Sequence, residues 1–283
     1  MRIFLDARDL INLADGKGPC SLDQLRGRLS SGGHEVALSP TVVFEVAAPL
    51  VDSSTHTVVM RRLDALESLP VAYLADGQIG RRELTSAIDS FSRGREYAPI
   101  DPYVDRFDAA IPLLGPAPTA NYLRHSLAET VFTIWQQAPE LLRRPTKWID
   151  RLQAVMAADR SLPSTPPLAS HFREKLRRDL HLYEIGEPSS RVDALADWIY
   201  ELPDRRPGVR LDYEVFHHLR RNVGDRPTAS DFGDFVHVMC LPYVDLITLD
   251  RRMADYVRRS GQGWQRAPSV RIRHDLKSVI PEL

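Results

Sequence analysis

Five acidic residues are placed in the sequence where they could bind a divalent metal ion. Each follows a short apolar run or opens the helical stretch after one: Asp6, Glu45, Asp231, Asp234 and Asp250. One such acid alone is also typical of a helix cap or first turn. Several converging carboxylates repel one another, which raises their pKa values unless a cation offsets the charge. Because Mg²⁺ and Mn²⁺ prefer oxygen ligands, the set predicts a site for one of these ions.

The elements that must bring these acids together are strands of one sheet. Short β-branched and aromatic runs predict five strands, at residues 2–5, 34–38, 71–74, 245–248 and 270–273. Helical periodicity lies between them, and Pro40 suits the first turn of a helix through 42–48. Such alternation predicts an α/β fold, a parallel central sheet in a three-layer α/β/α arrangement. Ligands bind at the carboxyl edge of such a sheet, where the acids are expected.

The middle of the chain has a different pattern. Apolar residues recur every three or four positions in long segments, which predicts helices at residues 121–137, 147–159, 171–183, 191–202 and 213–222. We therefore expect residues 1–90 and 225–283 to be the first and second parts of one α/β domain. Residues 91–224 are expected to form an all-helical insertion between them.

The composition excludes several classes of protein. The chain has 283 residues, 37 Lys and Arg against 38 Asp and Glu, 43% hydrophobic residues and two cysteines. These values do not fit a disordered chain, a collagen-like repeat or a disulfide scaffold. No apolar run approaches the roughly 18 residues that span a bilayer. An acid at position 6 does not fit a signal peptide, so a soluble cytoplasmic protein with no membrane partner is expected.

Four motifs together resemble the PIN-domain ribonuclease family. They run from Ile3 to Asp6, from Leu38 to Glu45, from Ser230 to His237 and from Leu246 to Asp250, in the order that the family shows. The resemblance covers roughly residues 1–90 and 225–275, and it implies a PIN-like fold. The long insertion departs from the compact members of the family.

The resemblance also implies an activity and its residues. A PIN-like protein would be a Mg²⁺- or Mn²⁺-dependent nuclease that hydrolyses RNA phosphodiester bonds, as an endoribonuclease or an exoribonuclease. Asp6, Glu45 and either Asp231 or Asp234 would hold the metal, and Asp250 would complete or orient the site. The family spacing slightly favours Asp231, but residues 234–237 also resemble the family's helix opening, so both acids stay candidates.

Other residues are assigned supporting roles. The resemblance implies that the Thr248 hydroxyl donates to a carboxylate or to a bound water. His237 is expected to pack or to cap a helix. An acidic site needs cations around it to hold a polyanion, and Arg251 and Arg252, next to Asp250, are the candidates for substrate binding. Further basic clusters lie at residues 81–82, 143–144, 173–178, 205–206 and 220–221.

Two other functions stay open at the level of the sequence. The chain could be a catalytically silent PIN-like scaffold or binding module, whose helical insertion contacts a protein partner. Completeness of the acidic set favours the nuclease over the scaffold. A toxin of a toxin–antitoxin pair rests on analogy with the family alone, and the length of the chain counts against it.

Overall fold

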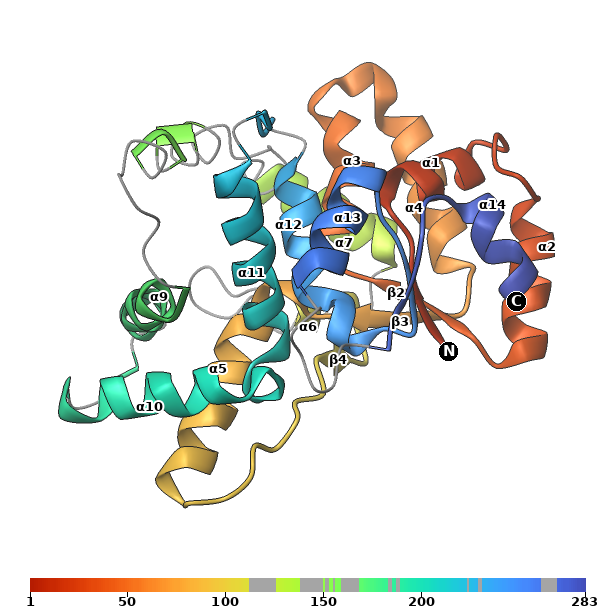
Figure 1. The fold of residues 1–283 in the computed structure, drawn as a ribbon. Helices are drawn as coiled ribbons and strands as arrows, with labels where there is room; N and C mark the ends of the chain where they lie inside the picture. The colour runs from red at the N-terminus through yellow and green to blue at the C-terminus, as the bar shows by residue number, and fades with distance from the viewer. Residues whose placement is uncertain are drawn as a thin grey trace.

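A six-stranded sheet lies at the centre of the structure (Figure 1). The computed structural model describes residues 1–111, 126–137, 150, 153–154, 156–158, 168–182, 185–186, 189–222, 224–228, 231–260 and 269–283. The strand order is β4-β3-β2-β1-β5-β6. The strands are β1 (Arg2–Phe4), β2 (Glu35–Leu38), β3 (Val71–Leu74), β4 (Tyr103–Val104), β5 (Leu246–Thr248) and β6 (Arg271–Arg273). All neighbouring strands pair parallel except β4, which pairs antiparallel with β3 at the edge.

Helices cover both sides of this sheet. In Figure 1, α11 and α12 lie on one side of the strands, and α2 and α14 lie on the other. The described helices are α1 (Ala7–Ala14), α2 (Leu22–Gly32), α3 (Pro40–Ala47), α4 (His56–Glu67), α5 (Asp76–Ser92), α6 (Phe107–Ala110), α7 (Leu127–Gln137), α9 (Leu168–Leu182), α10 (Ser189–Glu201), α11 (Pro207–Arg221), α12 (Asp231–Cys240), α13 (Arg251–Ser260) and α14 (Leu276–Val279). Within the described ranges, no helix is both long enough and apolar enough to cross a membrane.

The strands predicted from the sequence are confirmed to within one residue at each end. The helix after β2 is confirmed as well. Pro40 occupies its first turn, where no backbone N–H is needed, and the Val42 N–H donates to Ser39 Oγ at 3.3 Å. A mixed α/β fold with a mostly parallel sheet is therefore what local patterns in the two ends of the chain encode.

Two details of the prediction are wrong. The sheet is not wholly parallel, and residues 91–224 are not all helical, because β4 lies in that segment and extends the sheet. A strand of two residues leaves no periodic signal, so the sequence pattern could not reveal it. The helix predicted at 213–222 begins earlier, at Pro207, again because proline suits a first helical turn. Most of the helix predicted at 147–159 lies outside the described residues, as do residues 121–125 of another.

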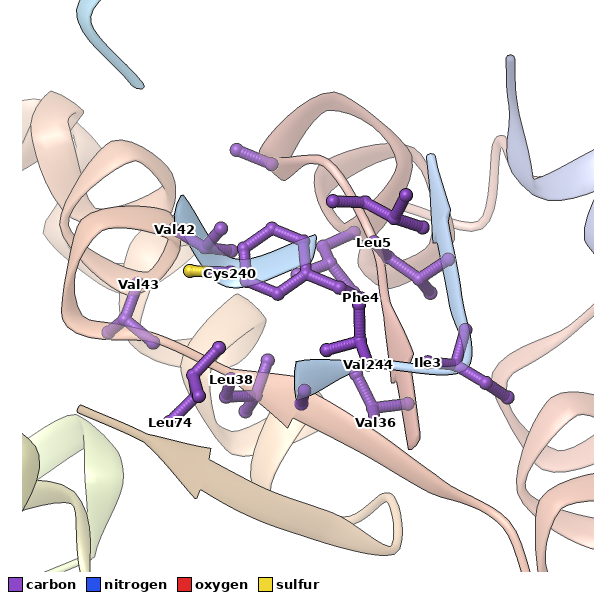
Figure 2. Packing of buried hydrophobic residues seen from close by; sticks show 14 of the residues in the cluster. Ile3, Phe4, Leu5, Val36, Leu38, Val42, Val43, Leu74, Cys240 and Val244 are labelled. Atoms are coloured by element: carbon purple, nitrogen blue, oxygen red, sulfur yellow. The ribbon is translucent and has the colours of Figure 1, made fainter. Parts of the chain in front are cut away.

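The core joins the two ends of the chain to part of its middle. Figure 2 shows the Phe4 ring of β1 lying close to Val42 of α3 and Cys240 of α12, with all three side chains buried. The same cluster includes Leu127 of α7 and Leu211 of α11, from the middle section. A second, smaller cluster is formed mainly by α5, α9 and α10. Residues 91–224 therefore contribute to both clusters.

Candidate active site

Asp6 lies at the carboxyl end of the central strand. It follows β1 and caps α1, where its Oδ1 accepts from the Arg8 N–H at 3.3 Å. The Asp6 N–H donates to Thr248 Oγ1 at 2.7 Å. This bond forms because β1 and β5 pair in parallel, which brings their carboxyl ends to the same edge of the sheet. The Thr248 hydroxyl therefore positions the backbone of Asp6.

Asp250 lies at the same edge, two residues after β5. Its Oδ1 accepts from the Met253 N–H at 2.6 Å, so the side chain caps the first turn of α13. The capping bond fixes one carboxylate oxygen. Its neighbour Arg251 is exposed on the first turn of α13.

Asp234 lies among all the other predicted acids. It belongs to the first turn of α12, and its pKa is raised to about 8. Burial is the largest cause, followed by the negative charges of Asp250, Asp6, Asp231 and Glu45. Each of the other four carboxylates is thus close enough to interact with this one side chain. The sequence slightly favoured Asp231 as the direct ligand, but Asp234 is the residue that the other four surround.

Glu45 reaches this group from α3 through a gap that a glycine leaves. A Cβ added at Gly233 of α12 would overlap Glu45 Oε1. The same Cβ would lie 3.2 Å from the other carboxylate oxygen, Glu45 Oε2. Gly233 is therefore needed for the carboxylate of Glu45 to lie against α12. This requirement could not be read from the sequence, since it depends on how two helices meet.

Asp231 is engaged elsewhere. Its Oδ2 accepts from the Thr228 N–H at 2.6 Å, and its Oδ1 accepts from the Arg252 guanidinium. The same guanidinium donates to Asp225 Oδ1 at 3.0 Å. The sequence placed Arg252 at the substrate, whereas in the structure it is a counter-ion that ties α13 to the start of α12. A basic side chain beside several buried acids pairs with them, because an unpaired buried charge is costly.

Asp9 is a member of the site that the sequence reasoning missed. It lies one turn after Asp6 on α1 and is buried, which raises its pKa, while the nearby Thr248 side chain and Leu276 backbone partly oppose that rise. Its Oδ2 has no hydrogen-bond partner among the described residues. The spacing of three residues from Asp6 was the available signal, since residues so spaced share a helix face.

His237 packs beneath this group, as the sequence predicted. Its ring lies edge-on to Phe4, with the centroids 4.9 Å apart, and both ring nitrogens lack a partner among the described residues. Burial lowers its pKa to about 4, so the ring is neutral at ordinary pH. It supports the floor of the site as an uncharged side chain.

The oxygen atoms of these acids suit a hard divalent cation, but the side chains are not arranged around one common point where an ion could bind. The five acids supply only oxygen ligands, and the raised pKa of Asp234 marks negative charge that a cation would offset. Within the described part of the chain, however, no three Asp, Glu, His or Cys side chains are arranged so that they could hold one ion. Binding a metal would therefore require some of these side chains to rotate toward one another.

Comparison with known proteins leaves the family of the chain open. No family model matches it, and neither the curated proteins nor the solved structures contain a match. Its function is therefore inferred from the acidic site and the residues around it.

Proposed function

We propose that the chain is a Mg²⁺- or Mn²⁺-dependent ribonuclease whose metal ligands are drawn from Asp6, Glu45, Asp234 and Asp250. The observation that carries the proposal is the position of Asp234, whose pKa is raised by burial and by four other carboxylates. Carboxylates gathered in this way repel one another and destabilise a fold unless positive charge offsets the repulsion, and a divalent cation with oxygen ligands supplies such charge.

When bound, the metal supplies an acidified water molecule and positive charge beside the phosphodiester. The chain's own residues hold and orient that centre. Thr248 fixes the backbone of Asp6 through the 2.7 Å bond to its N–H. Asp250 keeps one oxygen on the Met253 N–H, which sets the direction of the other. Asp234 has to lose its proton before it can act as a ligand.

Asp231 has a positioning role in this proposal. Both of its oxygens already accept hydrogen bonds, from the Thr228 N–H and from Arg252. It therefore holds the first turn of α12, which carries Asp234, against α13. The proposal therefore takes Asp234, and not Asp231, as the direct ligand.

A catalytically silent scaffold is the second candidate. The observation that favours it is the ion pair of Arg252 with Asp231 and Asp225, which already neutralises part of the acidic group. In that case the site would need no metal. The helices of the middle section would then contact a protein partner.

Substitution of Asp6 or Asp250 by Asn distinguishes the two functions. Both residues cap helices and asparagine caps equally well, so D6N and D250N are expected to fold normally. Cleavage of a labelled single-stranded RNA with Mn²⁺ should fall by more than roughly a hundredfold, since a lost ligand costs at least as much as a lost supporting residue. D64N, at an exposed acid on α4, is the matched control and should cleave like the wild type.

The same proteins give a readout that needs no catalysis. Mn²⁺ should raise the thermal unfolding midpoint of the wild type and of D64N by mass action, and much less that of D6N or D250N. Full cleavage by D6N/D250N would disprove the assigned site. A wild-type protein that neither cleaves RNA nor responds to millimolar Mn²⁺ would favour the scaffold.

A further inference from the structure

A groove of about 560 Å³ opens beside the acidic site, between α1, α13 and α14. Asp250 and Asp9 line one part of it, so the groove and the acidic site share a wall. Its volume is in the range of about 300–1,000 Å³ that is typical of ligand sites. Most of the residues that line the groove lie outside the acidic group.

Cationic side chains gather around this groove. Arg8, Lys17, Arg251 and Lys277 line it together with His274. Within the described part of the chain, no ion-pair partner is found for Arg251 or Lys277, and both are exposed. Arg8 donates to the backbone oxygen of His274 at 3.3 Å. Lys17 pairs with Asp15 at 3.6 Å, so Arg251 and Lys277 are the cations whose charge a ligand could neutralise.

Asp275 is an exposed carboxylate close enough to interact with Lys277 and Arg8, so it offsets part of this charge. Asp275 caps α14 by accepting from the Ser278 N–H at 2.9 Å, and Asp250 caps α13. Asp9 is buried. Among the described residues that line the groove, exposed cations therefore outnumber the one exposed acid on its rim, Asp275, and the acidic end of the groove is the candidate active site.

Many of the described cations of the middle section are paired within that section. The basic cluster at residues 143–144 lies outside the described residues, whereas the clusters at 173–178 and 205–206 form ion pairs: Arg173 with Asp197, Lys175 and Arg206 with Asp179, Arg177 with Asp193, and Arg205 with Glu201. Arg210 pairs with Glu214. Arg252 is likewise held by Asp225 and Asp231. These paired cations are therefore less available to a phosphate than Arg251 and Lys277.

We infer that a nucleic-acid strand leaves the acidic site through this groove, with its phosphates held by Arg251, Lys277 and the neighbouring cations. The inference rests on the proposed function for its substrate class. Phosphates attract Lys and Arg through their charge, independently of base sequence. A strand lying over α1, α13 and α14 would present a phosphodiester to Asp250 while its flanking phosphates stay on the cationic rim.

Binding of short labelled strands to the full chain tests this inference, with a chelator present to prevent cleavage. The double variant R251Q/K277Q removes two exposed cations of the groove, and R81Q/R258Q removes two exposed cations from α5 and the far end of α13. R251Q/K277Q should bind RNA several-fold more weakly. The slope of log affinity against log salt should fall by roughly 1.4, since each phosphate contact on a single strand contributes about 0.7. R81Q/R258Q should match the wild type in both.

RNA and DNA of one sequence are compared, because both carry the same phosphates. Weaker binding of both strands by R251Q/K277Q supports recognition of phosphates alone, and weaker binding of RNA only supports a track for RNA. Unchanged binding of both strands, or an equal loss in R81Q/R258Q, overturns the inference. Cleavage by the wild type with Mn²⁺ is measured separately, so a groove that binds without cleavage would refute the nuclease and leave the groove standing.

Discussion

At the scale of single residues, Asp234 combines burial with strong repulsion from nearby negative charges. Burial and four nearby carboxylates raise its pKa to about 8 from the usual 3.8. A carboxyl whose pKa is higher in the folded state favours folding while it is protonated. Its contribution to stability is therefore greatest at low pH and is lost as the pH rises from about 4 to about 8.

Removing the charge of Asp234 should therefore stabilise the protein while removing its activity. At pH 8, without metal, we expect D234N to gain at least about 1 kcal/mol, which raises the unfolding midpoint by roughly 2–4 °C. D231N should instead lower the free energy of unfolding, because it breaks the ion pair between Asp231 and Arg252 and leaves the guanidinium with one acid fewer. Thermal unfolding in a chelator measures both. A lower unfolding midpoint for D234N would show that the negative charge of Asp234 does not destabilise the folded state.

The affinity for Mn²⁺ should rise with pH for the same reason. A metal ion must displace the proton of Asp234. Below the pKa of about 8 the proton competes with the metal ion and weakens binding, and above this pKa the competition is lost. Titration calorimetry at several pH values should show tighter binding and less proton release as the pH approaches 8. A pH-independent affinity would place the metal away from Asp234.

At the scale of elements, the site depends on how closely α3 and α12 approach each other. Gly233 leaves room on α12 for the carboxylate of Glu45, and a Cβ there would overlap Glu45 Oε1. The end of a glutamate side chain can swing away at little cost. A methyl group at position 233 is therefore expected to move Glu45 and leave the helices in place.

The variant G233A tests this arrangement without changing any acid. We expect a large loss of Mn²⁺-dependent cleavage with an unfolding midpoint close to that of the wild type. The matched control is G27A on α2, where an added Cβ meets nothing within 4 Å. It should cleave normally and gain roughly 0.5–1 kcal/mol in stability from better helix propensity. Normal activity of G233A would mean that Glu45 is not a ligand.

At the scale of the whole molecule, a buried carboxylate joins the middle section to the sheet domain. Glu83 of α5 accepts from the Gly208 N–H at 2.7 Å and from the Val209 N–H at 3.0 Å, at the start of α11. It also accepts from the Tyr243 hydroxyl, close to the end of α12. Since α11 packs against both α12 and α13, the middle section supports the helices that carry Asp234 and Asp250.

Weakening this junction should destabilise the entire chain. E83Q leaves one of the buried N–H donors without its charged acceptor, which should cost about 2 kcal/mol of unfolding free energy. E201Q removes a partner of Arg205 at an exposed position, at 3.5 Å, and should cost less than about 0.5 kcal/mol. Denaturant unfolding followed by circular dichroism and fluorescence should give one shared transition. Two separate transitions would show that the middle section unfolds independently.

The amino-acid sequence by itself determined the strands, the parallel order of most of the sheet and the set of acids at its edge. These features are local, because a strand followed by an acid is recorded in consecutive residues, and parallel strands bring their carboxyl ends together. The positions of Asp6 and Asp250 could therefore be predicted, whereas the position of Glu45 against α12 also depends on Gly233. The inference of an RNA substrate came from resemblance, and it stays a prediction.

Only the tertiary structure decided which of the acids is paired with a cation and which lies among the other carboxylates. Arg252 pairs with Asp231, across 21 positions of the chain, and so leaves Asp234 as the acid that the others surround. The short edge strand β4 and the groove beside Asp250 likewise depend on contacts between distant segments. Ion pairing and close packing are set by distances in space, which periodicity along the chain does not record. For this reason two neighbouring arginines that look alike in the sequence differ in the structure: Arg252 is held by Asp225 and Asp231, whereas Arg251 is exposed beside the groove.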